Sequence, residues 1–141
     1  MISTERDEHW GGITAQIQLD AARFEPEALA GLAAFSHVEI LFVLDQVSED
    51  KVERKQRHPR NNPKWPKVGI FAQRGRNRPN RIGVTICEVA GVSGLSLQVR
   101  GLDAFDGSPV LDIKPVMAEF LPDRKAVQQP QWARELMSTY F

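Results

Sequence analysis

Basic and aromatic side chains gather in one segment of the sequence, between Lys51 and Arg81. The segment holds 11 of the 18 basic residues and one acidic residue, Glu53, so its formal charge is +10 and that of the rest is −10. His58, Trp65 and four prolines are interleaved with these charges. Phosphates attract such a segment, and planar side chains can stack on unpaired bases. The pattern predicts RNA contact through residues 51–81, and a solvated loop is the simpler alternative.

A second group of candidates consists of an acidic strand end, an arginine and a turn. Asp45 and Gln46 follow an apolar segment, where a carboxylate could bind a ligand or cap a turn. Arg74 could bind a carboxylate through two parallel hydrogen bonds, or it could be a solvated loop residue. Residues 106–109 (Asp-Gly-Ser-Pro) predict a tight turn, in which Gly107 permits close approach.

Three further polar residues favour structural interpretations. A histidine such as His37 is more often a hydrogen-bonded structural residue than a catalyst. Asp112 and Lys114 lie two residues apart on one strand face, so we expect an ion pair rather than a general base. The acidic residues and histidines show no metal-ligand spacing, and we expect no metal site.

Apolar periodicity predicts six short strands, at residues 13–19, 38–44, 68–72, 82–89, 95–102 and 110–113. Residues 38–44 are apolar on both faces except for Glu39, which predicts a central strand. Residues 25–35 and 131–140 are expected to be helical, and residues 46–67 form a long loop. Short strands at near-regular spacing predict an all-β fold, a small antiparallel β-barrel with a few short helices.

Composition is that of one soluble domain covering residues 1–141, with 42% hydrophobic and 26% charged residues. No apolar run approaches the roughly 20 residues that span a bilayer, so we expect no membrane segment. The start, MISTERDEHW, lacks the apolar core of a secretory signal. Cys87 is the single cysteine and cannot form an internal disulfide, which favours a reducing compartment, the cytoplasm.

Three ordered motifs resemble those of the TrmO (YaeB/TsaA-like) methyltransferases. Residues 35–46 follow F-S-H-x-W-x-L-F-x-F-H-Q, residues 69–83 follow G-V-F-A-T-R-S-x-x-R-P-N-P-I-G, and residues 103–116 follow D-x-x-D-G-T-P-V-x-D-I-K-P-Y. The chain differs at positions where the family has His, Ser, Pro and Tyr: Asp45, Gly75, Arg81 and Val116.

The resemblance implies a β-barrel that acts as a homodimer and binds S-adenosylmethionine (SAM). It also implies methylation of the exocyclic nitrogen of threonylcarbamoyladenosine in the tRNA anticodon loop. The cofactor-binding positions that it implies in this chain are Asp45, Gln46, Arg74, Val84, Asp106, Gly107, Ser108, Pro109 and Val110. In this setting Arg74 would bind the methionine carboxylate, and the turn would bind the adenine edge.

Methyl transfer from a sulfonium to nitrogen is an in-line displacement, so positioning can supply much of the rate. The nitrogen must also lose a proton, and the base is open between Asp45, Asp106 and water. Two alternatives remain beside the methyltransferase. One is a SAM-binding or RNA-binding module without turnover, and the other is an interaction domain without a cofactor.

Overall fold

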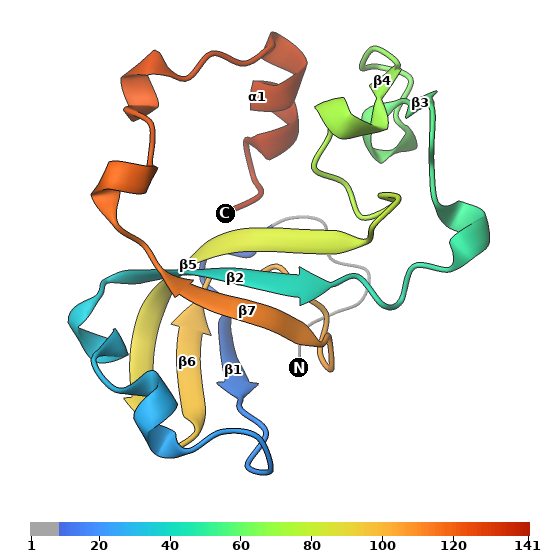
Figure 1. Cartoon of the computed structure of the whole chain (residues 1–141). Coiled ribbons are helices and arrows are strands. Elements are labelled where there is room, and N and C mark those ends of the chain that lie inside the picture. The colour runs from blue at the N-terminus through green and yellow to red at the C-terminus, as the bar shows by residue number, and fades with distance from the viewer. Residues whose placement is uncertain (1–8) are drawn as a thin grey trace.

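The computed structural model describes residues 9–141. Residues 1–8, which carry most of the expectation about a secretory signal, lie outside the described residues. The main element is a five-stranded antiparallel sheet in the order β1–β6–β5–β2–β7 (Figure 1). Its strands are β1 (Thr14–Gln18), β2 (His37–Val43), β5 (Ile82–Ser93), β6 (Ser96–Arg100) and β7 (Val110–Pro115).

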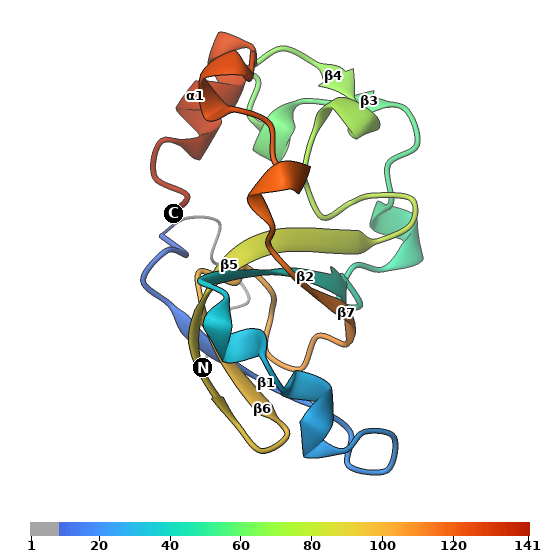
Figure 2. The same ribbon diagram turned by 60° about the vertical axis from the view of Figure 1, so that its left-hand side comes forward.

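A separate two-stranded hairpin and several short helices complete the fold. The hairpin pairs β3 (Gln56–Arg57) with β4 (Val68–Gly69). The α-helix α1 (Gln131–Met137) lies at the same end of the molecule as this hairpin (Figures 1 and 2). The other helices are single 3-10 turns: Pro26–Leu29, Leu32–Ala34, Glu49–Lys51, Pro59–Asn61, Ile70–Ala72, Ala118–Phe120 and Arg124–Ala126. None of the helices in residues 9–141 has the length and apolarity to cross a membrane.

The core lies on one face of the sheet. Val38, Ile40 and Phe42 alternate along β2 and are almost completely buried. They pack with apolar residues of β1, β5 and β6, including Ile17 and Leu97. The alternation places these side chains together because successive strand residues point to opposite faces.

The opposite face of β2 and β5 carries a second group of apolar residues, together with Glu39, which lies opposite Ile86. In the antiparallel register Leu41 lies opposite Val84, and Val43 lies opposite Ile82. Ile82 and Ile86 are 43% and 44% exposed. An exposed apolar patch on a sheet is typical of an interaction surface.

Strand β5 is longer than predicted and links two parts of the sheet. Its first half pairs with β2 and its second half with β6, with a register shift between Val89 and Gly91. Figure 1 shows the strong curve of this strand. The strand order begins with β1 and ends with β7, so the sheet is not closed. The predicted all-β antiparallel class is confirmed, and the closed barrel is not.

Two predicted elements differ from the structure for local reasons. Residues 25–35 form two 3-10 turns rather than one helix, because Gly31 has a left-handed φ of 85° between them. Only Val68–Gly69 of the predicted strand 68–72 is extended. Ile70 donates its backbone N–H to the Lys55 carbonyl, and the chain then turns.

The C-terminal tail pairs with the beginning of the described chain. The backbone N–H groups of His9 and Trp10 donate to the carbonyls of Thr139 and Tyr140, at 2.8 and 2.7 Å. A Cβ atom on Gly11 would lie 2.8 Å from the Phe141 carbonyl carbon, so only glycine fits this contact. The tail is therefore part of the folded unit.

Candidate functional site

The end of β2 and the beginnings of β5 and β7 meet at one edge of the sheet. The binding residues predicted from the sequence lie there. Val43, the last residue of β2, donates its N–H to the Pro109 carbonyl at 2.9 Å. The next residue, Leu44, donates to the Arg81 carbonyl at 2.8 Å. Asp45 and Gln46 follow directly, with exposed side chains. The register of β2 with β5 and β7 thus places Asp45 between the loop before β5 and the turn before β7.

Arg74 lies next to β5. Its guanidinium donates to the Val84 carbonyl at 2.9 Å, so these two predicted site residues are in contact. The Arg74 side chain is exposed, and Val84 is half-buried. No other hydrogen bond to the Arg74 guanidinium is formed within residues 9–141, so its remaining N–H groups can reach a ligand.

The predicted turn at residues 106–109 is confirmed. The Ser108 N–H donates to the Phe105 carbonyl at 3.0 Å, and Gly107 has a left-handed φ of 83°. The space around Gly107 is open. The Arg76 guanidinium lies 5.3 Å from the centre of the Phe105 ring, which is cation–π distance. This contact joins the turn to the loop that carries Arg74.

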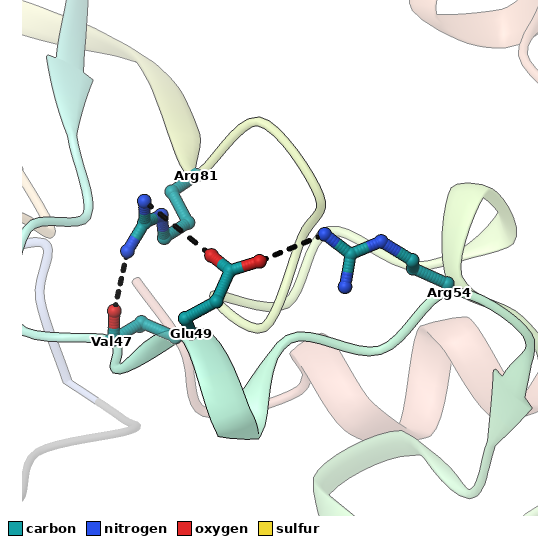
Figure 3. Close-up of polar contacts among 4 residues, drawn as sticks. All are labelled: Val47, Glu49, Arg54 and Arg81. Atoms are coloured by element: carbon teal, nitrogen blue, oxygen red, sulfur yellow. Dashed lines mark hydrogen bonds and ion pairs between the residues drawn. The ribbon is translucent and has the colours of Figure 1, made fainter.

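Other arginines of the basic segment hold its loops in place. Arg78 donates to the carbonyls of Ile70 and Gln73. Arg81 donates to the Val47 carbonyl at 3.0 Å and lies 3.7 Å from the Glu49 carboxylate (Figure 3).

Glu49 also pairs with Arg54 at 2.9 Å, on the other side of its carboxylate (Figure 3). The hydrogen bond from Arg54 lowers the pKa of Glu49 below its ordinary value. These exposed contacts fix the path of the loops more than they stabilise the fold, because solvent screens surface ion pairs.

Trp65 and His58 make structural contacts, whereas Phe71 is exposed. The Trp65 indole N–H donates to the Glu135 carboxylate at 2.9 Å, and the His58 ring contacts the Trp65 carbonyl at 2.7 Å. Both side chains are half-buried. Phe71 is 77% exposed and is the aromatic side chain of residues 51–81 most open to a partner.

The other predicted polar residues lie outside the central group. Asp112 and Lys114 form the expected ion pair, at 2.8 Å, on β7. The pair lowers the pKa of Asp112 and raises that of Lys114. His37 begins β2 and contacts the Ser36 hydroxyl at 2.7 Å, at the opposite end of the strand from Asp45. Residues 9–141 hold no group of three or more side chains suited to a metal ion.

A half-buried hydrogen-bonded cluster around Asp103 is absent from the sequence predictions. The Asp103 carboxylate accepts hydrogen bonds from the hydroxyls of Thr85 and Tyr140. Burial and the nearby Asp103 charge raise the pKa of Tyr140 far above its ordinary value. The same causes raise the pKa of Cys87 to about 12. No local pattern signals this cluster, because Tyr140 lies 37 residues from Asp103 in the chain.

The fold is a small antiparallel β domain with polar side chains at one edge of its sheet, and comparison with known proteins identifies its family. Residues 6–121 match the model of the tRNA-methyltransferase O N-terminal domain. The chain belongs to this family.

Relatives and a solved structure agree with the family. The Escherichia coli tRNA (adenine(37)-N6)-methyltransferase is 39% identical over 117 residues, which cover 79% of this chain and 49% of that protein. A probable S-adenosyl-L-methionine-binding protein of Methanothermobacter thermautotrophicus is 45% identical over 89 residues, 63% of this chain and 61% of that protein. The crystal structure of TrmO from Pseudomonas aeruginosa superposes with a TM-score of 0.65 at 29% identity, covering 85% of this chain and 48% of that one.

The chain spans from about a fifth to about half of the length of the methyltransferases that it matches. Residues 122–141, which include α1 and the C-terminal tail, lie beyond the family match.

Proposed function

We propose that this protein is a SAM-dependent methyltransferase that acts on a modified adenosine in tRNA. The observation that carries the proposal is the joining of three segments, 45–46, 73–84 and 105–110, at one edge of the sheet. Backbone hydrogen bonds to Val43 and Leu44 and the Arg76–Phe105 contact hold the segments together. Membership of the family and the names of its relatives support the same reaction.

The polar groups at this edge fit the chemistry of SAM. The exposed Asp45 carboxylate suits a cation or a ribose hydroxyl, and Gln46 offers an amide beside it. The Arg74 N–H groups not used by Val84 suit a carboxylate. The open turn at residues 106–109 offers backbone N–H and C=O groups to a base edge, with Val84 and Val110 as apolar wall. These are the cofactor contacts that we propose, through Asp106, Gly107, Ser108, Pro109 and Val110 in the turn.

The chain's own residues would act mainly by positioning. A bound SAM would supply an electrophilic methyl group, and the charge on its sulfur disappears during transfer. Arg74 and Asp45 hold opposite ends of such a molecule, which aligns the methyl group with an incoming nitrogen. Holding both reactants in line is worth several kcal/mol of the barrier. The exposed carboxylates of Asp45 and Asp106 remain the candidates, with water, for removing the proton of the nitrogen.

The partners in this proposal are tRNA and a second copy of the chain. The +10 segment at residues 51–81 supplies the charge that phosphates attract. The exposed apolar face of β2 and β5, with Leu41, Val43, Ile82, Val84 and Ile86, suits a second subunit in a homodimer. Such a subunit would add wall area beside Val84. We further propose that residues 1–141 act as one TsaA-like domain in the cytoplasm.

Two successive measurements test this function. Calorimetry with SAM tests cofactor binding, and transfer of tritium from methyl-labelled SAM to total tRNA tests turnover. The proposal predicts both binding and transfer. Binding without transfer would instead favour a SAM-binding module, and absence of any binding would favour an interaction domain.

A matched pair of variants connects the activity to the site. Arg74→Gln removes the guanidinium at the edge, and Arg23→Gln removes an exposed arginine from the turn after β1. We expect Arg74→Gln to weaken SAM binding at least tenfold, since a charged bidentate contact contributes about 1.5–3 kcal/mol. Arg23→Gln should bind SAM as the unmodified protein does.

A further inference from the structure

A hollow of about 430 Å³ lies between α1 and the segment that leads into it. Its lining residues are Arg124, Val127, Gln129, Arg134 and Met137. All five lie beyond residue 121, where the family match ends. The hollow therefore lies outside the residues that match the family model, and it shares no lining residue with the edge that carries Arg74.

Both arginines of the hollow have uncommitted guanidinium groups. Neither forms an ion pair or side-chain hydrogen bond with any group in residues 9–141. The acidic residues next to them in the chain are occupied elsewhere. Asp123 accepts from the Lys125 N–H at 3.0 Å, and Glu135 accepts from the Trp65 indole at 2.9 Å. Two such guanidinium groups at one hollow are well suited to bind a phosphate group, because phosphate oxygens accept paired hydrogen bonds from arginine.

The hollow is attached to the basic segment rather than isolated from it. The Trp65–Glu135 hydrogen bond joins residues 70 positions apart and fastens α1 to residues 51–81. The Tyr140–Asp103 hydrogen bond holds the end of the tail on the sheet. Both views show α1 and the β3–β4 hairpin at the same end of the molecule (Figures 1 and 2). A nucleic acid that follows the +10 segment would thus meet the hollow next.

We propose that this hollow binds a backbone phosphate of the RNA, with Arg124 and Arg134 as its ligands. The inference deepens the proposed function and rests on it, because it assigns a further contact to the same substrate. Gln129 adds an amide donor, and Val127 and Met137 add an apolar surface for a ribose. The size of the hollow suits one nucleotide unit, since small-molecule sites begin at about 300 Å³.

The test is the salt dependence of tRNA binding by the full chain. Fluorescence anisotropy with labelled total tRNA at several salt concentrations gives the slope of log K against log salt. The Arg124→Gln/Arg134→Gln double variant should lower the magnitude of this slope by about one, because one phosphate contact is lost, and weaken binding roughly tenfold at about 0.15 M salt. Lys125→Gln and Arg23→Gln together form the control, because neither side chain lines the hollow and the charge change is equal. SAM binding should stay unchanged in both double variants.

Each outcome decides the proposal. If the slope of log K against log salt fell equally in the double variant and the control, the proposal would be overturned. The net positive charge of the protein, rather than the hollow, would then explain the binding. The unmodified protein could instead bind adenosine monophosphate saturably, and the double variant could lose this binding while its salt slope for tRNA stays unchanged. That result would also overturn the proposal, in favour of a site for a free nucleotide. If the protein binds tRNA but transfers no methyl group, the proposed function fails while the slope still decides the phosphate contact. If it binds no tRNA at all, both fail.

Discussion

At the scale of single residues, Gly83 shows how a core contact shapes the candidate binding edge. Gly83 lies opposite Phe42 in the β2–β5 ladder, and a Cβ atom there would lie 2.5 Å from the Phe42 Cζ atom. The Phe42 ring is 2% exposed and packs in the core, so it has little room to move. The next residue is Val84, whose carbonyl receives the Arg74 hydrogen bond. The absence of a side chain at Gly83 thus keeps β2 and β5 close beside the site.

We expect Gly83→Ala to lower the free energy of unfolding by about 1–3 kcal/mol, the usual cost of overpacking. Chemical denaturation measures this change. Gly12→Ala is the matched control, because a Cβ at Gly12 meets no atom within 4 Å. Equal stability of the two variants would show that Phe42 yields readily to a methyl group at position 83.

Cys87 predicts a dependence of stability on alkaline pH. Burial, with a contribution from the charge of Asp103, raises the pKa of its thiol to about 12 in the folded protein, from an ordinary value of 9.0. The neutral thiol contributes its full stability at pH values below the pKa of the unfolded chain. This contribution is lost as the pH rises through the higher pKa of the folded protein. We therefore expect the contribution of Cys87 to fall between about pH 9 and pH 12, by roughly 1 kcal/mol per pH unit.

Cys87→Ala isolates this contribution. The variant loses some packing at every pH, but its unfolding free energy should depend less steeply on pH above about 9 than that of the unmodified protein. Denaturation at a series of pH values compares the two slopes. Parallel slopes would contradict a buried, neutral thiol at this position.

At the scale of elements, the C-terminal tail is fastened by side chains as well as by backbone. The Tyr140 hydroxyl donates to the Asp103 carboxylate, which also accepts from Thr85 on β5. Asp103 precedes the turn at residues 106–109, so the tail, β5 and the segment leading to the turn share one hydrogen-bonded centre. Such a centre costs free energy when one partner is removed, because the remaining polar group stays half-buried.

We expect Tyr140→Phe to destabilise the protein by about 1–3 kcal/mol, since it removes a hydrogen bond to a charged group and keeps the ring. Thermal unfolding measures this loss. Thr139→Ala serves as the control, because Thr139 contributes its backbone carbonyl to the tail pairing. If Asp103→Asn and Tyr140→Phe had fully additive effects, the two residues would not be coupled.

The strands were predictable where the side-chain pattern alone determines them. Alternation identified β1, and the nearly uninterrupted apolar run of residues 38–44 correctly predicted the central position of β2. The turn at residues 106–109 and the Asp112–Lys114 pair were equally local and are confirmed. Gly31, which divides the predicted helix, acts through its left-handed φ, a conformation that the Ala- and Leu-rich surroundings do not reveal.

Contacts between distant segments were not predictable from local patterns. Trp65 meets Glu135 across 70 positions, and Tyr140 meets Asp103 across 37. The charge pattern assigned Trp65 to an RNA surface, whereas its indole group is tied to α1. The meeting of residues 45–46, 73–84 and 105–110 depends on strand register. The sequence suggested it through resemblance to a family rather than through periodicity.

At the scale of the whole molecule, the +10 segment and the apolar group on the outer face of β2 and β5 lie on different elements. The positive charge belongs to residues 51–81, whereas the exposed apolar residues Ile82 and Ile86 lie on β5. A homodimer through the outer face of β2 and β5 would cover the apolar surface, and it need not bury the basic segment. This division suits a dimer that presents its charged loops to RNA.

We expect the protein to sediment as a dimer and Ile86→Glu to sediment as a monomer, because a carboxylate in an apolar interface loses its hydration. Analytical ultracentrifugation distinguishes the two states. Thr14→Glu introduces the same charge at an exposed position on β1 and should leave the dimer intact. A monomeric unmodified protein would rule out the homodimer.

In the proposed site, Asp45–Gln46, Arg74 and the turn at residues 106–110 bind one SAM molecule. Titration of the isotope-labelled protein with SAM, followed through its backbone amide NMR signals, tests this claim most directly. We expect the largest saturable shifts to fall together on residues 45–46, 74, 84 and 106–110. Saturable shifts confined to another part of the sheet, with these signals unchanged, would contradict it.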